Sequence, residues 1–149
     1  MTKDRILVAF DGSAAGVAAL EKAVAITEMD DASIDLLYVI DTRSYQVGFA
    51  QQPDVDGTIL YNAETRAEIE LEEQAKPLRA RGIEVRTHLR FGNPRTVVAL
   101  DAPKDYDSSL IILGRSSKRL TSRMFIGSVA SFVTENAPCD VLIVANPNA

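Results

Sequence analysis

The chain has 149 residues and a formal net charge of −5 at pH 7, with 46% hydrophobic and 25% charged residues. This balance is typical of a globular protein, and the acidic charge gives no general support for binding nucleic acid. No apolar run approaches the roughly 20 residues that cross a bilayer, and the N-terminus shows no secretory leader. We therefore expect one domain over residues 1–149, in the cytoplasm, with no membrane or nucleic-acid partner. The lone cysteine, Cys139, excludes an internal disulfide and fits that compartment.

Short apolar runs alternate with helical patterns from the start of the chain. The first run covers residues 5–10, and Ser13 is placed to cap a helix over residues 13–29. A second apolar run covers residues 34–40. Residues 41–57 are expected to form a loop longer than most connections in compact domains.

An amphipathic helix is expected over residues 58–81, with Gly82 ending it as a C-cap. Apolar residues recur at three- and four-residue steps along this stretch, which defines its inner face. The glutamates expected to face water are Glu64, Glu68, Glu70, Glu72 and Glu73.

The alternating pattern of residues 83–91 predicts a half-exposed strand at a sheet edge, with His88 on its solvent side. Asn93 and Pro94 are typical of a helix start, as cap and first helical residue. The residues expected to turn inward from this helix are Val97, Val98 and Leu100.

The chain ends with a strand over residues 109–113, a helix over 128–136 and a strand over 140–145. Five strands that alternate with helices predict right-handed crossovers and an α/β doubly wound parallel sheet with helices on both faces. Ligands in such sheets bind outside the carboxyl ends of the strands. The turns at residues 11–13 and 114–117 would both lie at that edge.

The loop after the fourth strand carries the clearest functional signal. No acidic residue lies between Asp107 and Glu135, whereas Arg115, Lys118, Arg119 and Arg123 all fall in that window. Gly127 and Ser128 then open a helix, whose first N–H groups and dipole favour negative charge. The pattern predicts an anion site.

Five segments, at residues 6–13, 37–41, 110–114, 126–130 and 137–144, together resemble the universal stress protein family over essentially the whole chain. The resemblance implies a Rossmann-like, adenine nucleotide alpha hydrolase-like fold with strand order 3-2-1-4-5. It also implies a stress-response protein.

Members of this family that bind ATP carry a G-x2-G-x9-G-[ST] pattern. Here Gly114 and the pair Gly127-Ser128 keep their spacing, but Ser117 replaces the second glycine. A glycine there could adopt positive φ and let the backbone approach the phosphates closely, whereas serine offers a hydroxyl donor instead. Because Gly127-Ser128 and the basic loop are kept, we predict ATP or a related adenine nucleotide (AMP or ADP), with nucleotide-bound Mg²⁺.

The resemblance also implies roles for individual residues. Asp11 lies near the ribose and any metal, and the backbone of Val39 reads the adenine edge. The remaining predicted site residues are Ala9 at the base, Gly114, Arg115, Ser116 and Ser117 along the ribose and phosphates, and Gly127, Ser128, Val129 and Ala130 as N–H donors. From the residues alone, Asp11 could equally brace the turn before the first helix.

These features favour a stress-response module that senses adenine nucleotide and signals through an unknown partner. Two alternatives stay open: a dimeric interaction module that has lost nucleotide binding, and a slow ATP hydrolase. No catalytic base is evident, so robust turnover is not expected. The apolar strand over residues 141–144 has no following helix to cover it and would attract a second copy. The resemblance likewise implies a homodimer through this strand.

Overall fold

The computed structural model describes residues 3–43, 58–116 and 126–145. In chain order its elements are β1 (Asp4–Ala9), α1 (Ala14–Thr27), β2 (Ala32–Ile40), α3 (Thr58–Ala80), β3 (Val85–Phe91), α4 (Pro94–Thr96), the π-helical turn η2 (Val97–Asp101), α5 (Ala102–Tyr106), β4 (Leu110–Gly114), α6 (Ser128–Asn136) and β5 (Asp140–Val144). Residues 44–57 of the predicted loop and most of the basic loop lie outside the described residues.

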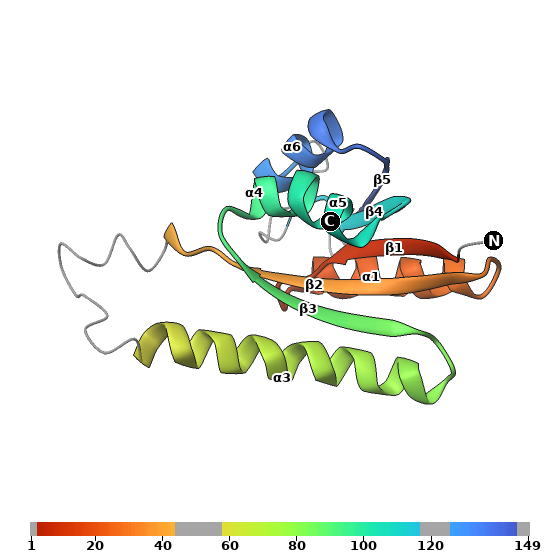
Figure 1. Cartoon of the computed structure of the whole chain (residues 1–149), viewed down its shortest axis with the longest axis horizontal. Helices are drawn as coiled ribbons and strands as arrows, with labels where there is room; N and C mark the ends of the chain where they lie inside the picture. The colour runs from red at the N-terminus through yellow and green to blue at the C-terminus, as the bar shows by residue number, and fades with distance from the viewer. Residues whose placement is uncertain (1–2, 44–57, 117–125, 146–149) are drawn as a thin grey trace.

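The strands form one sheet in the order β3-β2-β1-β4-β5, and every neighbouring pair is parallel (Figure 1). The predicted fold class and strand order are confirmed. Because β2 and β4 flank β1 on opposite sides, the chain changes winding direction between β1 and β4. The carboxyl ends of β1 and β4 therefore meet at the topological switch point, where such sheets bind ligands.

Helices cover both faces of the sheet. On one face Ile6, Val8 and Leu36 pack against α1 and α3; on the other Leu7 and Ile111 pack against η2, α5 and α6. Figure 1 shows α4, α5 and α6 on the opposite side of the sheet from α3. This division follows from the strand pattern, since successive side chains point to opposite faces.

The predicted cap residues Ser13 and Gly82 are confirmed, although α1 ends at Thr27 rather than near Met29. The Ser13 side chain accepts a hydrogen bond from the Gly16 N–H (3.2 Å) and caps α1. Gly82 follows α3 with φ of +86°, and its N–H donates to the Arg79 carbonyl (3.0 Å). The next residue, Ile83, donates its N–H to Leu78 (3.1 Å), so it belongs to the helix cap and β3 starts later than predicted.

The helix that begins at Pro94 corrects one expectation. Val97 and Val98 are buried as predicted, but Leu100 is 41% exposed and Ala99 is fully buried in its place. The Ala102 N–H donates to the Val97 carbonyl, a five-residue step that closes a π-turn. The extra residue in that turn shifts the helical phase, so the 3.6-residue pattern fails here.

The expectation of a solvent-facing His88 is wrong. Its side chain is 20% exposed, stacks on Tyr106 (centroids 4.0 Å apart) and lies with Nε2 2.8 Å from Oδ1 of Asp35. The buried Asp35 carboxylate also accepts from Arg5 (2.9 Å) and Arg86 (3.1 Å). Burial alone would raise the pKa of Asp35, but the hydrogen bonds from His88, Arg5 and Arg86 outweigh it and hold that pKa at about 2.

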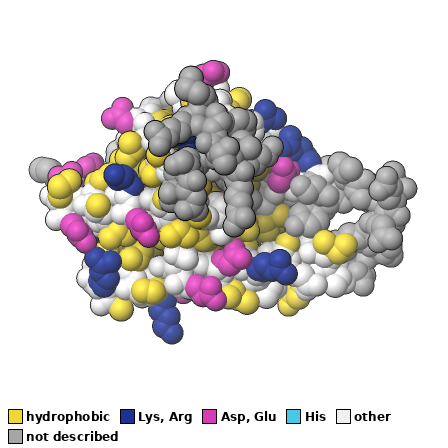
Figure 2. Space-filling model, turned by 180° about the vertical axis from the view of Figure 1, so that it is seen from behind, with side chains coloured by type: hydrophobic (Ala, Val, Ile, Leu, Met, Phe, Trp, Pro, Cys, Tyr) yellow, Lys and Arg dark blue, Asp and Glu magenta, His cyan; other side chains and the backbone are white. Residues whose placement is uncertain are grey.

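The surface is mixed in charge. Seen from behind, the described residues show acidic and basic side chains interspersed with apolar ones rather than gathered in one large patch (Figure 2). In the part of the chain that the structure describes, no helix is both long and apolar enough to span a membrane.

Candidate functional site

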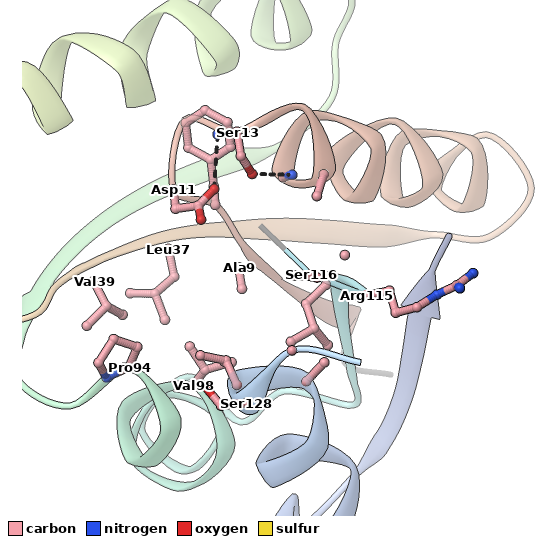
Figure 3. Close-up of a pocket in the computed structure, with 18 residues that line it drawn as sticks. Ala9, Asp11, Ser13, Leu37, Val39, Pro94, Val98, Arg115, Ser116 and Ser128 are labelled. Carbon is pink, nitrogen blue, oxygen red and sulfur yellow. Dashed lines mark hydrogen bonds between the residues drawn. The ribbon is translucent and has the colours of Figure 1, made fainter. Parts of the chain in front are cut away.

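A cavity of about 330 Å³ opens at the carboxyl edge of the sheet, between the turn after β1, the end of β4 and the start of α6 (Figure 3). Ten of the predicted site residues line it: Ala9, Asp11, Val39, Gly114, Arg115, Ser116, Gly127, Ser128, Val129 and Ala130. The eleventh, Ser117, lies outside the described residues. Segments far apart in the sequence therefore meet at one site.

One end of the cavity is an apolar slot, formed by Ala9, Leu37, Val39, Pro94 and Val98. Figure 3 shows Val39 and Leu37 facing Pro94 and Val98 across it. Such a slot suits a flat, weakly polar ring, which would exchange water for apolar contact on both faces. Sequence reasoning missed Leu37, Pro94 and Val98 as site residues; the Asn93-Pro94 helix start directly after β3 was the signal that could have indicated this wall.

The other end of the cavity is the N-terminus of α6. Gly127 is its N-cap, with φ −65° and ψ 160°. The first bond within the helix runs from the Ser131 N–H to the Gly127 carbonyl (3.0 Å), so α6 does not use the N–H groups of Ser128, Val129 and Ala130. Three donors at a positive helix end make a favourable position for an anion.

Close backbone packing explains the two glycines that bound this end. A Cβ at Gly114 would lie 2.6 Å from the Ala15 Cβ, and one at Gly127 would lie 3.2 Å from the Arg115 carbonyl oxygen. The Gly127 N–H donates to that same oxygen (2.8 Å), and the Arg115 N–H donates to Val144 of β5 (2.9 Å). Figure 3 shows the Arg115 side chain pointing away from the cavity, so its backbone forms the lining.

Asp11 braces the turn after β1, and it also lines the cavity. Its Oδ1 accepts a hydrogen bond from the Ser13 N–H (3.0 Å), which braces the turn, and its side chain also lines the cavity. One carboxylate fits nucleotide-bound Mg²⁺, which takes one or two carboxylates plus substrate phosphates. The described residues contain no group of three or more His, Cys, Asp or Glu that could hold a metal ion by themselves.

Glu70 of α3 corrects another expectation, since it does not simply face water. Its Oε2 is buried without a hydrogen-bond partner among the described residues. This oxygen lies 2.7 Å from the position that a Cβ would take at Gly12, where φ is +85°. Glycine at position 12 therefore lets α3 pack against the turn that carries Asp11.

Fold and site together define a doubly wound α/β protein with a cavity at the switch point. Comparison with known proteins identifies its family. The model of the universal stress protein family matches residues 3–145, so the chain belongs to that family. A relative from Staphylococcus saprophyticus that bears the same family name is 30% identical over 145 residues, covering 97% of this chain and 84% of the relative.

Solved structures agree with the fold. The universal stress protein UspA from Lactobacillus plantarum is 26% identical, with a TM-score of 0.74 over 97% of this chain and 99% of that one. The protein MJ0577 superposes with a TM-score of 0.84 at 23% identity, over 100% of both chains. Among more distant structures, at 17% and 18% identity, an Arabidopsis thaliana family member has AMP bound and another universal stress protein is in complex with cAMP.

Proposed function

We propose that this chain binds an adenine nucleotide, ATP or its products ADP and AMP, and acts as a stress-response module that senses the nucleotide. The observation that carries the proposal is the division of one cavity into an apolar slot and the donor-bearing start of α6. A nucleotide has the same division, with a flat base at one end and phosphate at the other. The AMP and cAMP complexes of related structures support this choice.

In this proposal the base lies between Val39 and the wall formed by Pro94 and Val98. The phosphates take the N–H groups at the start of α6, and Asp11 lies over the ribose and any nucleotide-bound Mg²⁺. Bound Mg²⁺ would supply positive charge to the phosphate oxygens. Asp11 is the one carboxylate of the described lining, and it is engaged with the Ser13 N–H, which supports binding rather than rapid hydrolysis.

A route from the site to the outside of the molecule supports the signalling role. The peptide of Arg115 joins the N-cap of α6 to β5, through the bonds from Gly127 (2.8 Å) and to Val144 (2.9 Å). A nucleotide bound at α6 could therefore shift the position of β5 through this peptide. We propose that the homodimer forms along β5.

The dimer proposal rests on β5 as a sheet edge. Among the described strands it pairs with β4 alone, and residues 141–144 are only half-buried although all are apolar. Val141→Lys should convert a dimer to a monomer in sedimentation velocity, because a lysine on an edge strand disfavours its pairing with another strand. Met29→Lys, at a residue 79% exposed, is the matched control and should leave the dimer intact. A wild-type monomer would refute the proposal.

The nucleotide proposal is tested by two changes at opposite ends of the cavity. Val39→Trp should fill the apolar slot and abolish binding of AMP and adenosine in calorimetry. Ser128→Pro should remove one N–H donor while preserving α6, because proline is favoured at the first helical position and Gly127 already has a compatible ψ of 160°.

Ser128→Ala is the control for the lost hydroxyl. We expect AMP affinity to fall about tenfold in Ser128→Pro relative to Ser128→Ala, the effect of one hydrogen bond to a charged group. Adenosine, which lacks phosphate, should bind both variants equally. Equal affinity of AMP for both would contradict the placement of phosphate at α6.

A further inference from the structure

A second cavity adjoins the first on the α3 side of Asp11. It measures about 260 Å³ and shares two lining residues, Asp11 and Val39, with the proposed nucleotide cavity. Its other lining residues are Tyr38, Ile40, Asp41, Ala63 and Arg66. The two cavities therefore adjoin at Asp11 and Val39, and Asp11 is the carboxylate that both linings share.

Two charged side chains that line this second cavity, Asp41 and Arg66, differ in whether they have a partner. Asp41 is held by Arg43 through two hydrogen bonds (2.8 and 2.9 Å), which lower the pKa of Asp41 and cancel its charge locally. Arg66 has no hydrogen bond or ion pair with any described residue. Of the charged groups that line the cavity, Arg66 is therefore the cation available to a ligand.

Glu70, the expected partner of Arg66 on α3, does not pair with it. Glu70 lies four residues further along α3, a spacing that normally favours an ion pair. Its carboxylate instead packs against Gly12, with Oε2 buried. Ala63, one turn before Arg66, is small and leaves the cavity open beside the guanidinium. The opposite wall is Tyr38, whose ring meets Phe10 edge-on at 6.1 Å.

We propose that this second cavity takes a phosphate carried on the ribose hydroxyls of the bound nucleotide, with Arg66 as its cationic contact. The inference rests on the proposed function. Because Asp11 and Val39 line both cavities, the proposal places the ribose beside Asp11 with its 2′- or 3′-hydroxyl directed to the second cavity. A phosphate on either hydroxyl enters the space that Arg66 lines. The ligand class is then an adenosine bisphosphate rather than a simple 5′-nucleotide.

The test compares AMP with adenosine 3′,5′-bisphosphate and adenosine 2′,5′-bisphosphate by calorimetry. Wild type should bind one of the bisphosphates about tenfold more tightly than AMP, the gain from one charge-assisted contact. Arg66→Gln should abolish that gain and leave AMP affinity unchanged, which also shows that the variant is folded. Lys76→Gln, which removes one exposed cation elsewhere on α3, is the matched control and should keep the gain.

Two results would overturn the inference while leaving the proposed function intact. One is equal affinity of wild type for AMP and both bisphosphates. The other is a gain that survives in Arg66→Gln or is lost equally in Lys76→Gln, which would assign it to general electrostatics. Failure of AMP itself to bind wild type would refute the proposed function, and this inference with it.

Discussion

Replacing Asp35 with asparagine tests the polar cluster that links β1, β2 and β3. The side chain has no exposed surface, and its pKa lies at about 2 against 3.8 for a free aspartate. Since one pKa unit corresponds to about 1.4 kcal/mol, the ionised carboxylate contributes roughly 2 kcal/mol of stability at neutral pH. The variant also leaves Arg5 without its anion and Arg86 with Glu84 alone, but both arginines are partly exposed, so we expect a total loss of about 2–3 kcal/mol.

The loss at Asp35 should depend on pH in a defined direction. The pKa of Asp35 is lower in the folded state than in the unfolded state, so its contribution is complete above about pH 4 and disappears as the pH falls through 2. Urea unfolding should therefore show a gap between wild type and Asp35→Asn that is largest at pH 7 and roughly halved at pH 3.

Asp105→Asn is the control for an exposed ion pair. Asp105 contacts Arg90 at 2.8 Å but is 54% exposed, so its loss should cost under about 1 kcal/mol. A gap for Asp35→Asn that is equally small, or that is the same at pH 3 and pH 7, would refute the account of the buried carboxylate.

Three further changes test the local structure by urea unfolding. Gly114→Ala should cost about 1–3 kcal/mol, because the new Cβ would lie 2.6 Å from the Ala15 Cβ; a neutral result would contradict the close approach of α1 to β4. Ser13→Ala should cost about 1 kcal/mol through loss of the cap, and no change would mean that the cap is dispensable. At the π-turn, Leu100→Gln should change the free energy of unfolding by less than about 0.5 kcal/mol, whereas Ala99→Leu should cost about 1–3 kcal/mol. The reverse order would indicate a regular helix with about 3.6 residues per turn and no π-turn.

The fold could be predicted from the sequence because its signals are local and agree with one another. Apolar runs mark the strands, Ser13 and Gly82 mark helix ends, and the alternation of elements implies a parallel sheet. The gathering of Asp11 and Gly127 at one edge also followed, since parallel strands direct their carboxyl ends to the same side.

What the sequence could not show depends on contacts between distant segments. His88 pairs with Asp35, 53 positions away, and nothing in the alternation of β3 announces that partner. Glu70 fits the polar face of an isolated helix, and only the packing of α3 on the β1 turn buries its oxygen against Gly12. The π-turn is likewise a departure from regular geometry that a periodic pattern cannot reveal.

The most direct test of the central claim is equilibrium dialysis of the purified chain, stripped of any carried-over nucleotide, against labelled ATP in the presence of Mg²⁺. We predict saturable binding at one nucleotide per chain, displaced by unlabelled AMP. Absence of saturable binding at millimolar ATP and AMP would contradict the claim and favour an interaction module without nucleotide.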